Sequence, residues 1–405
     1  MSQLTRAALL LTSFLIFFIC ASAQDTAPSA TQKPEWYQRL KIRGYAQLRY
    51  NKLYETNPDL KCEQCDRSWG GDNGFFFRRI RIIFYGQVHE RVFVYIQPDF
   101  ASSPDGRNLQ FGQIRDAYFD VGIDKKNEFR FRIGQSKVPF GFENLQSSQN
   151  RIPLDRNDAL NSAVANERDI GIFFYWAPQK IRERFSDLVN SGLKGSGDYG
   201  VIGFGVHNGQ TANRPEGNST PHTVARISYP FLIGSKQFIE PGIQAYTGKN
   251  RVASTSASST GVTGSEDFIY DDKRIAATLI IYPQPFGLSA EYNIGSGPEY
   301  NLATNAIEQQ NLKGGYVMAS YMARINDQYL IPFTRYQYYD GGKKHELDAR
   351  SYSVKELEIG VEWQPIKNFE VVAMYTMSKR RFEDAATPVN FQEGSLIRLQ
   401  LQANF

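Results

Sequence analysis

The sequence predicts an all-β fold, a transmembrane antiparallel β-barrel of about 16 strands with short periplasmic turns and long extracellular loops. Three observations predict this fold class. Polar and apolar residues alternate in stretch after stretch from residue 41 to residue 405, which is the period of a β-strand. The connections between these stretches alternate between short and long, and the chain begins with a segment typical of export signals.

The composition excludes a disordered chain and a helical membrane protein. The 405 residues are 41% hydrophobic and include 28 Phe and 23 Tyr, whereas disordered chains are poor in aromatic residues. A membrane-spanning helix needs about 18 or more apolar residues in succession, and the long apolar run at residues 7–20 is shorter. The formal net charge of +4 is too small to predict a nucleic-acid partner.

Residues 1–23 are predicted to be a signal peptide. Arg6 supplies the positive start, residues 9–20 the apolar centre, and residues 21–23 (ASA) a cleavage site of small residues. Lipidation at Cys20 is the alternative, although a large Ile19 precedes it. We therefore expect export to the bacterial outer membrane, with residues 24–40 left as a periplasmic tail.

The mature chain is predicted to form sixteen strands of about ten residues each, the length that crosses a bilayer at a tilt. Their predicted ranges are 41–51, 75–86, 88–98, 112–123, 127–137, 169–177, 198–208, 221–230, 236–247, 273–283, 286–296, 312–324, 328–339, 352–364, 369–380 and 394–405.

The lengths of the connections favour a membrane barrel over a soluble one. Short links such as 284–285 and 365–368 fit hairpin turns on one rim, and long links such as 51–74 and 253–265 fit loops on the other. A soluble sandwich or propeller gives no reason for long loops on one side only. Segment 178–197 breaks the rule and contains the one helix-like run.

The last strand has the clearest face. It places apolar residues on one side and polar residues on the other, as a strand between lipid and a wet lumen requires. The terminal Phe405 resembles the C-terminal signal that outer-membrane porins present to their assembly machinery, so that machinery is a predicted partner. The two faces are Ile397, Leu399, Leu401, Ala403 and Phe405 against Arg398, Gln400, Gln402 and Asn404.

The charged faces of the strands are predicted to line the lumen. A charge that faces lipid near the midplane costs about 2–4 kcal/mol, so the opposite face must carry it. Carboxylates such as Asp99 share that face, and pairing between the two signs in a structural network is the alternative to an anion path. The predicted inward arginines of strands one, two and five are Arg43, Arg49, Arg79, Arg81, Arg130 and Arg132.

The segment around 138–168 is predicted to fold into the barrel and narrow the pore. A loop of about 30 residues needs a purpose, and charges act most strongly at a constriction. Its predicted site residues are Lys137, Arg151, Arg156 and Arg168. An extracellular loop folded over the rim is the alternative.

The remaining polar residues predict neither a cofactor nor an enzyme. Cys62 and Cys65 lie in a polar loop of an exported chain, which favours a local disulfide over a metal site. No metal-ligand spacing appears in the sequence. The four histidines stand outside any motif of nucleophile, base and acid.

Five motifs in order resemble the phosphate-selective porin O and P family. They are FFRRIR at 76–81, QPDFA at 97–101, RDAY at 115–118, GQSKVPFGFE at 134–143 and ERDIG at 167–171.

The resemblance implies a homotrimeric, sixteen-stranded channel in outer-membrane lipid, with an arginine-lined lumen narrowed by the third long loop. Arg78, Arg79 and Asp99 match the family's strand motifs, and Lys137 lies in the motif that leads into that loop. The expected function is passive diffusion of small hydrophilic solutes with a preference for anions such as phosphate. The alternatives are a non-selective porin, or a plugged structural or receptor barrel that binds extracellular partners.

Overall fold

The structure is a computed structural model, and it describes residues 35–55, 74–101, 111–164, 168–218, 220–255, 261–388 and 390–405. The predicted signal peptide, most of the predicted tail, and both Cys62 and Cys65 lie outside the described residues.

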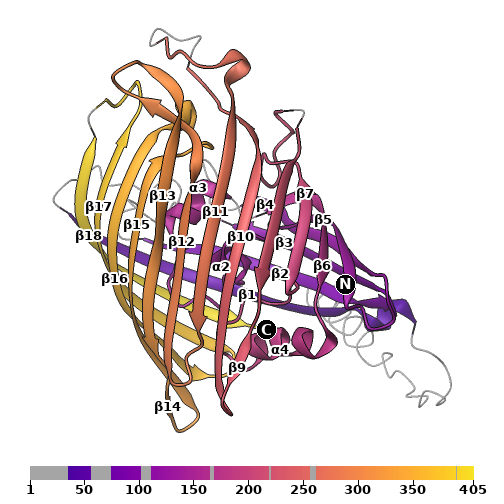
Figure 1. Cartoon of the computed structure of the whole chain (residues 1–405). Helices are drawn as coiled ribbons and strands as arrows, with labels where there is room; N and C mark the ends of the chain where they lie inside the picture. The colour runs from indigo at the N-terminus through magenta and orange to yellow at the C-terminus, as the bar shows by residue number, and fades with distance from the viewer. Residues whose placement is uncertain are drawn as a thin grey trace, which may run out of the picture. The chain divides into compact units, whose positions relative to one another are not determined.

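The strands form one antiparallel sheet that closes on itself (Figure 1). β1 (Lys41–Glu55) pairs with β2 (Phe75–His89) on one side and with β18 (Phe391–Asn404) on the other. The short strand β9 continues β8 along β10, and β14 continues β13 along β15. The 18 strands therefore make a closed 16-strand barrel, as predicted.

The other strands follow in chain order. They are β3 (Val92–Ala101), β4 (Phe111–Gly122), β5 (Phe129–Lys137), β6 (Arg168–Trp176), β7 (Ile202–His207), β8 (His222–Ser228), β9 (Phe231–Ile233), β10 (Gln237–Arg251), β11 (Ile269–Ile281), β12 (Phe286–Asn301), β13 (Ala306–Tyr321), β14 (Ala323–Ile325), β15 (Gln328–Gly342), β16 (Ser351–Ile366) and β17 (Phe369–Glu383).

Some strands extend further toward the extracellular end than predicted. The predicted strands 286–296 and 312–324 leave residues 297–311 as a long loop. This is wrong, because β12 and β13 continue as a hairpin with a turn at 302–305. Above the membrane the outward face of a strand no longer meets lipid and need not be apolar, so the alternation that reveals strands is lost. Glu308, Gln309 and Gln310 are successive polar residues of this kind.

Helices are short and few in the described chain. They are η1 (Trp36–Arg39), α2 (Phe142–Leu145), α3 (Asp158–Ala163), α4 (Gln179–Asn190), η2 (Glu266–Phe268) and η3 (Leu347–Ala349). α4 confirms the helix-like run predicted in segment 178–197. Among the described residues, no helix is both long and apolar enough to cross a membrane.

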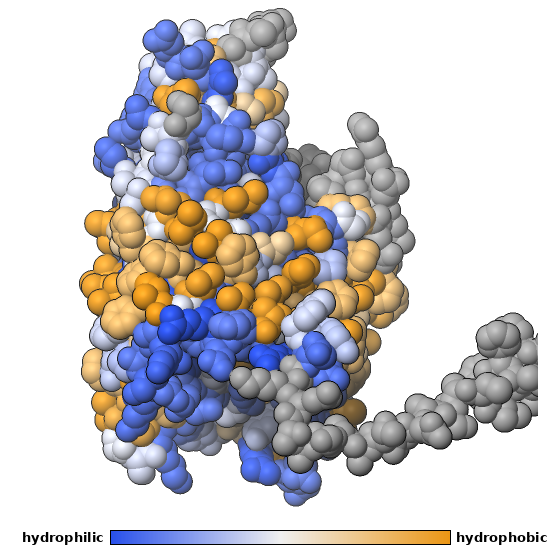
Figure 2. All heavy atoms as spheres, turned by 90° about the vertical axis from the view of Figure 1, so that its right-hand side faces the viewer, coloured by the Kyte–Doolittle hydropathy of each residue, from blue (hydrophilic) through white to orange (hydrophobic). Residues whose placement is uncertain are grey.

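The barrel is apolar outside and polar inside. Figure 2 shows an apolar band across the middle of one face of the barrel, between hydrophilic ends. Outward residues such as Ile243, Ile275 and Ile359 are at least half exposed. The largest fully buried side chains are dominated by arginines, namely Arg49, Arg130, Arg168, Arg274, Arg335, Arg380 and Arg398.

The outward face can be tested with a charge. Ile243 lies in the middle of β10, pairs with Ile227 and Ala277, and is 61% exposed. An Ile243→Lys change should cost about 2–4 kcal/mol, because the ammonium would face lipid near the midplane. The measurement is the urea midpoint for unfolding in lipid vesicles. Ile281→Lys, at the short-turn end of β11, is the control and should cost about 0–1 kcal/mol.

Candidate functional site

The third long loop, which connects β5 to β6, lies inside the barrel over its described residues 138–164 (Figure 1). It carries α2 and α3, and every residue of both helices is buried. Asn157 caps α3 by accepting a hydrogen bond from the Leu160 N–H at 3.0 Å. The start of the loop, at Val138 and Phe140, packs on the lumen side of β6, β8, β10 and β11.

The carboxylates of this loop point to the wall formed by β15–β18 and β1. Asp155 binds Arg398 of β18 and lies 3.4 Å from the Arg49 guanidinium of β1. Burial acts to raise the pKa of Asp155, but the charges of Arg398, Arg49 and Arg78 hold this pKa well below its ordinary value. Asp155 therefore stays ionised and anchors the loop.

Two further carboxylates dock the loop on the same side. Glu143 of α2 accepts a hydrogen bond from Arg335 of β15 at 2.7 Å. Asp158 of α3 lies 3.3 Å from the Lys343 ammonium and 3.7 Å from the Arg380 guanidinium. The loop thus uses its acidic residues as anchors, which removes them from the opposite side of the lumen.

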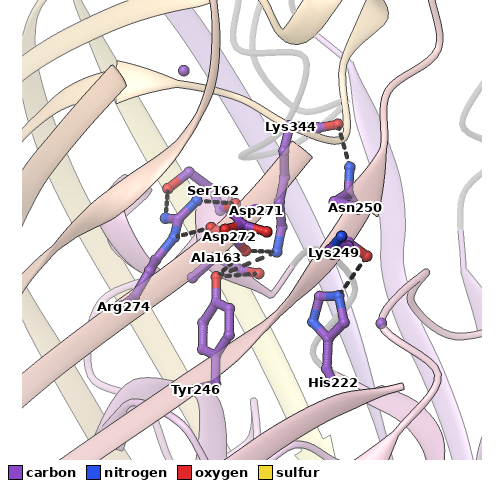
Figure 3. Close-up of polar contacts among 12 residues, drawn as sticks. Ser162, Ala163, His222, Tyr246, Lys249, Asn250, Asp271, Asp272, Arg274 and Lys344 are labelled. Atoms are coloured by element: carbon purple, nitrogen blue, oxygen red, sulfur yellow. Dashed lines mark hydrogen bonds and ion pairs between the residues drawn. The ribbon is translucent and has the colours of Figure 1, made fainter. Parts of the chain in front are cut away.

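A network at the end of α3 fixes the loop against β10 and β11 (Figure 3). Arg274 donates to the Ser162 hydroxyl at 2.7 Å and to the Asp272 carboxylate at 3.1 Å. Tyr246 donates to Asp272 at 2.5 Å, and Lys344 binds the same carboxylate from the loop after β15. One aspartate therefore holds two strands, the third loop and an extracellular loop together.

The basic residues of the loop face the other wall, where they join an arginine cluster. Burial, followed by the charges of Arg151, Arg115, Arg168 and Arg79, lowers the pKa of Arg156 well below its ordinary value. Arg79 and Arg151 are at most 5% exposed, and neither forms an ion pair with a described carboxylate. Five guanidiniums close enough to repel one another form an arrangement that an anion would stabilise.

Two irregular pairings explain how neighbouring residues in the sequence reach the lumen together. The β1–β2 register shifts between Gln47 and Leu48, so Arg78 is an extra residue in β2 beside Arg79. The β3–β4 register shifts in the same way, so Arg115 and Asp116 stand together. Bulges of this kind re-aim side chains at functional rims.

Most of the other predicted lumen arginines are paired. Arg81 donates to Asp99 at 2.9 Å, and Arg132 makes two hydrogen bonds to Asp120, at 2.8 and 2.9 Å. Arg130 lies 2.7 Å from the Asp198 carboxylate, which belongs to the segment after α4. The lumen is therefore a network of both signs along β2–β5.

Lys137 and Arg168 lie in strands and not in the constriction loop, so this part of the prediction is wrong. They are the last residue of β5 and the first of β6, and they face each other in the ladder. Strand pairing continues to the point where the chain turns inward. Lys137 donates to two loop carbonyls, those of Leu145 and Gln146, and Arg168 binds Asp116 at 2.9 Å.

α4 narrows the short-turn end of the lumen. Its Leu188 packs with Phe142 of the third loop. After the helix, Lys194 reaches β16 and lies 2.5 Å from the Glu362 carboxylate. Gln146 of the third loop donates to the Lys194 carbonyl at 2.6 Å, which joins the two inserted segments.

A cavity of about 480 Å³ remains between the third loop, α4 and the wall formed by β1–β6. We call this cavity the vestibule. Seven basic residues but three acidic ones line it. The basic residues are Arg43, Arg91, Arg130, Arg132, Lys137, Arg168 and Arg182, and the acidic ones are Asp116, Asp120 and Asp198.

Comparison with known proteins identifies the family of this chain. The profile of the phosphate-selective porin O and P family matches residues 59–405, whereas no curated protein sequence matches. Among solved structures, the barrel is similar to the outer membrane channel DcaP of Acinetobacter baumannii (14% identity, 90% of this chain, 97% of that chain, TM-score 0.57).

Two other porins share the fold. They are OmpT of Vibrio cholerae in its trimer form (10% identity, TM-score 0.50) and an anion-selective porin from Comamonas acidovorans (12% identity, TM-score 0.50); each alignment covers 90% of this chain and 99% of that chain. These identities show the fold alone. Because the family profile covers most of the sequence, this chain belongs to the phosphate-selective porin O and P family and is an outer-membrane channel and not an enzyme.

Proposed function

We propose that this porin passes small hydrophilic solutes with a preference for anions such as phosphate. The observation that carries the proposal is the division of charge across the third loop. Its carboxylates Glu143, Asp155 and Asp158 bind one wall, and its arginines Arg151 and Arg156 face the other. The remaining path is lined by an excess of positive charge.

An anion would pass two connected basic regions in this proposal, the arginine cluster and then the vestibule. It would enter at the arginine cluster, where guanidiniums offer planar forks that suit phosphate and carboxylate. Arg168 belongs to that cluster and also lines the vestibule. Arg43, which forms no ion pair with a described carboxylate, stands at the far end of the vestibule.

The proposal includes a trimer in outer-membrane lipid, exported by the 1–23 signal peptide and assembled through Phe405. OmpT of Vibrio cholerae has the same fold and a trimer form. Phe405 directly follows β18, exchanges two backbone hydrogen bonds with Gly44 at 2.7 and 2.9 Å, and is 63% exposed. The proposal also includes a Cys62–Cys65 disulfide.

Removing two charges from the arginine cluster should weaken anion selectivity. Arg79→Gln with Arg151→Gln leaves no described carboxylate without its ion-pair partner, so the fold should persist. One charge acting on an ion at about 4 Å is worth about 1 kcal/mol even in water, so removing two charges should lower the chloride-to-potassium permeability ratio by at least about fivefold. The measurement is the reversal potential in a planar bilayer under a KCl gradient.

The matched control changes the same number of charges outside the lumen. Arg251 and Arg324 are exposed, with 51% and 65% of their side chains accessible. Arg251→Gln with Arg324→Gln should leave the reversal potential unchanged. A reversal potential near zero in the unmodified protein, or equal reversal potentials in both double variants, would instead indicate a non-selective porin whose lumen carboxylates balance its arginines. Cation selectivity in the unmodified protein would contradict the proposal outright.

A further inference from the structure

The vestibule has an aromatic wall. Tyr85 of β2, Phe93 and Tyr95 of β3, and Tyr118 of β4 all line the cavity and are half-buried. The ring centroid of Tyr85 lies 6.5 Å from the centroids of Phe93 and Tyr95. Tyr95 stacks on Tyr118 with 5.1 Å between their ring centroids. The four rings therefore form one continuous row.

Two rings of this aromatic row carry a guanidinium. The Arg43 guanidinium carbon lies 5.1 Å from the ring centroid of Tyr85, and that of Arg132 lies 4.0 Å from the ring centroid of Tyr118. The two cations differ in their partners. Arg132 is held by two hydrogen bonds to Asp120, whereas Arg43 makes no ion pair with a described carboxylate.

Inorganic anions give no reason for such a wall. Chloride and phosphate are recognised by charge and hydrogen bonds, and rings that face a wet lumen leave apolar surface exposed to water. A row of rings beside an available guanidinium instead complements a ligand with a flat apolar body and one negative end. An edge-to-face contact would cover the exposed edges of the rings, and the guanidinium would bind the carboxylate.

We propose that the vestibule binds aromatic carboxylates with a single ring. The faces of Tyr95 and Tyr118 already stack on each other, so the face of the ligand's ring packs on the edges of these two tyrosines that line the cavity, and Arg43 binds the carboxylate. The cavity of about 480 Å³ lies within the usual 300–1,000 Å³ of small-molecule sites. The inference rests on the proposed function, because the ligand must first pass the arginine cluster, and it names the substrate class for the end of that path.

A pair of matched anions tests the aromatic site in the unmodified protein. Benzoate and cyclohexanecarboxylate have the same charge and similar size, but benzoate alone offers a π-face. We expect benzoate to half-block the chloride current of the reconstituted channel at about tenfold lower concentration, the factor that one good aromatic contact supplies. Equal blocking concentrations would overturn the proposal without any variant.

Two sets of variants separate the ring from the charge. Tyr95→Leu and Tyr118→Leu should raise the blocking concentration of benzoate toward that of cyclohexanecarboxylate and leave the latter unchanged. Arg43→Gln should raise both concentrations by the same factor. The control, Tyr336→Leu, removes a tyrosine that is 44% exposed on the outer face of β15, and it should change neither value.

The result also separates this proposal from the proposed function. Reversal potential reports the arginine cluster, whereas the ratio of the two blocking concentrations reports the aromatic row. An anion-selective channel with a ratio of one would disprove the aromatic site alone. A ratio near ten in a channel without anion selectivity would support the aromatic site and disprove the proposed selectivity.

Discussion

Replacing Asp155 by asparagine is expected to release the third loop from the barrel wall and to raise single-channel conductance. The change keeps the shape of the side chain and removes its charge. Arg49 and Arg398 are at most 1% exposed and would lose their shared carboxylate. Removing one partner of a buried ion pair costs about 3–5 kcal/mol. The docked conformation of the loop should therefore lose its stability relative to undocked ones.

The release can be measured as conductance in planar bilayers and as the uptake of neutral sugars of increasing size by vesicles. Asp384→Asn is the control, because Asp384 makes a 2.7 Å ion pair with Arg350 away from the third loop. It should leave conductance and the size limit unchanged. If the Asp155 variant folds and conducts like the unmodified protein, the other anchors hold the loop without this carboxylate.

The barrel could be predicted from the sequence because each strand meets two different solvents. The alternation in β18, from Leu396 to Asn404, follows directly from lipid on one side and a polar lumen on the other. The same rule identified the inward arginines of β1, β2 and β5. It failed at residues 297–311, where the outward face of the hairpin meets water in place of lipid and successive polar residues such as Glu308, Gln309 and Gln310 interrupt the alternation.

The anchors of the third loop could not be predicted, because their partners are far away in sequence. Glu143 meets Arg335 across 192 positions, and Asp155 meets Arg398 across 243. The ion pair between Asp272 and Lys344 is also invisible in the local sequence, because 72 positions separate the two residues. One feature of the sequence was informative: the loop that enters the charged lumen has nearly equal numbers of acidic and basic residues. The sequence did not show which barrel wall the acidic residues would face and which wall the basic ones.

The aromatic row was also hidden from a strand-by-strand interpretation. Tyr85, Tyr95 and Tyr118 alternate correctly with outward residues, so each can be assigned to the lumen. Their stacking depends on the register between strands, in which Tyr85 pairs with Tyr95 and Tyr95 with Tyr118. Register follows from the closed barrel and its bulges, which single-strand patterns do not specify.

Replacing residues 179–198 by a short Asn-Gly turn is expected to widen the periplasmic end of the channel. The replacement is compatible with the sheet, because Trp176 and Ile202 are already register partners and the Val201 N–H donates to the Trp176 carbonyl at 2.7 Å. It removes α4 and the Lys194–Glu362 contact from the mouth. It also removes one acidic and one basic residue of the vestibule, Asp198 and Arg182, and leaves the Glu362 carboxylate without Lys194, so anion selectivity should fall while conductance rises.

The control, Lys180→Ala, changes an exposed residue of α4 and should alter neither conductance nor selectivity.

The constriction and the vestibule lie in series, so their resistances add and the narrower one dominates. If the constriction at the third loop is narrower than the vestibule, the turn replacement should change selectivity more than conductance. Adding Asp155→Asn, which releases the third loop, should then reveal the full effect of the turn replacement on conductance. A replacement variant that folds but keeps both the conductance and the selectivity of the unmodified protein, even in that combination, would mean that α4 does not border the ion path.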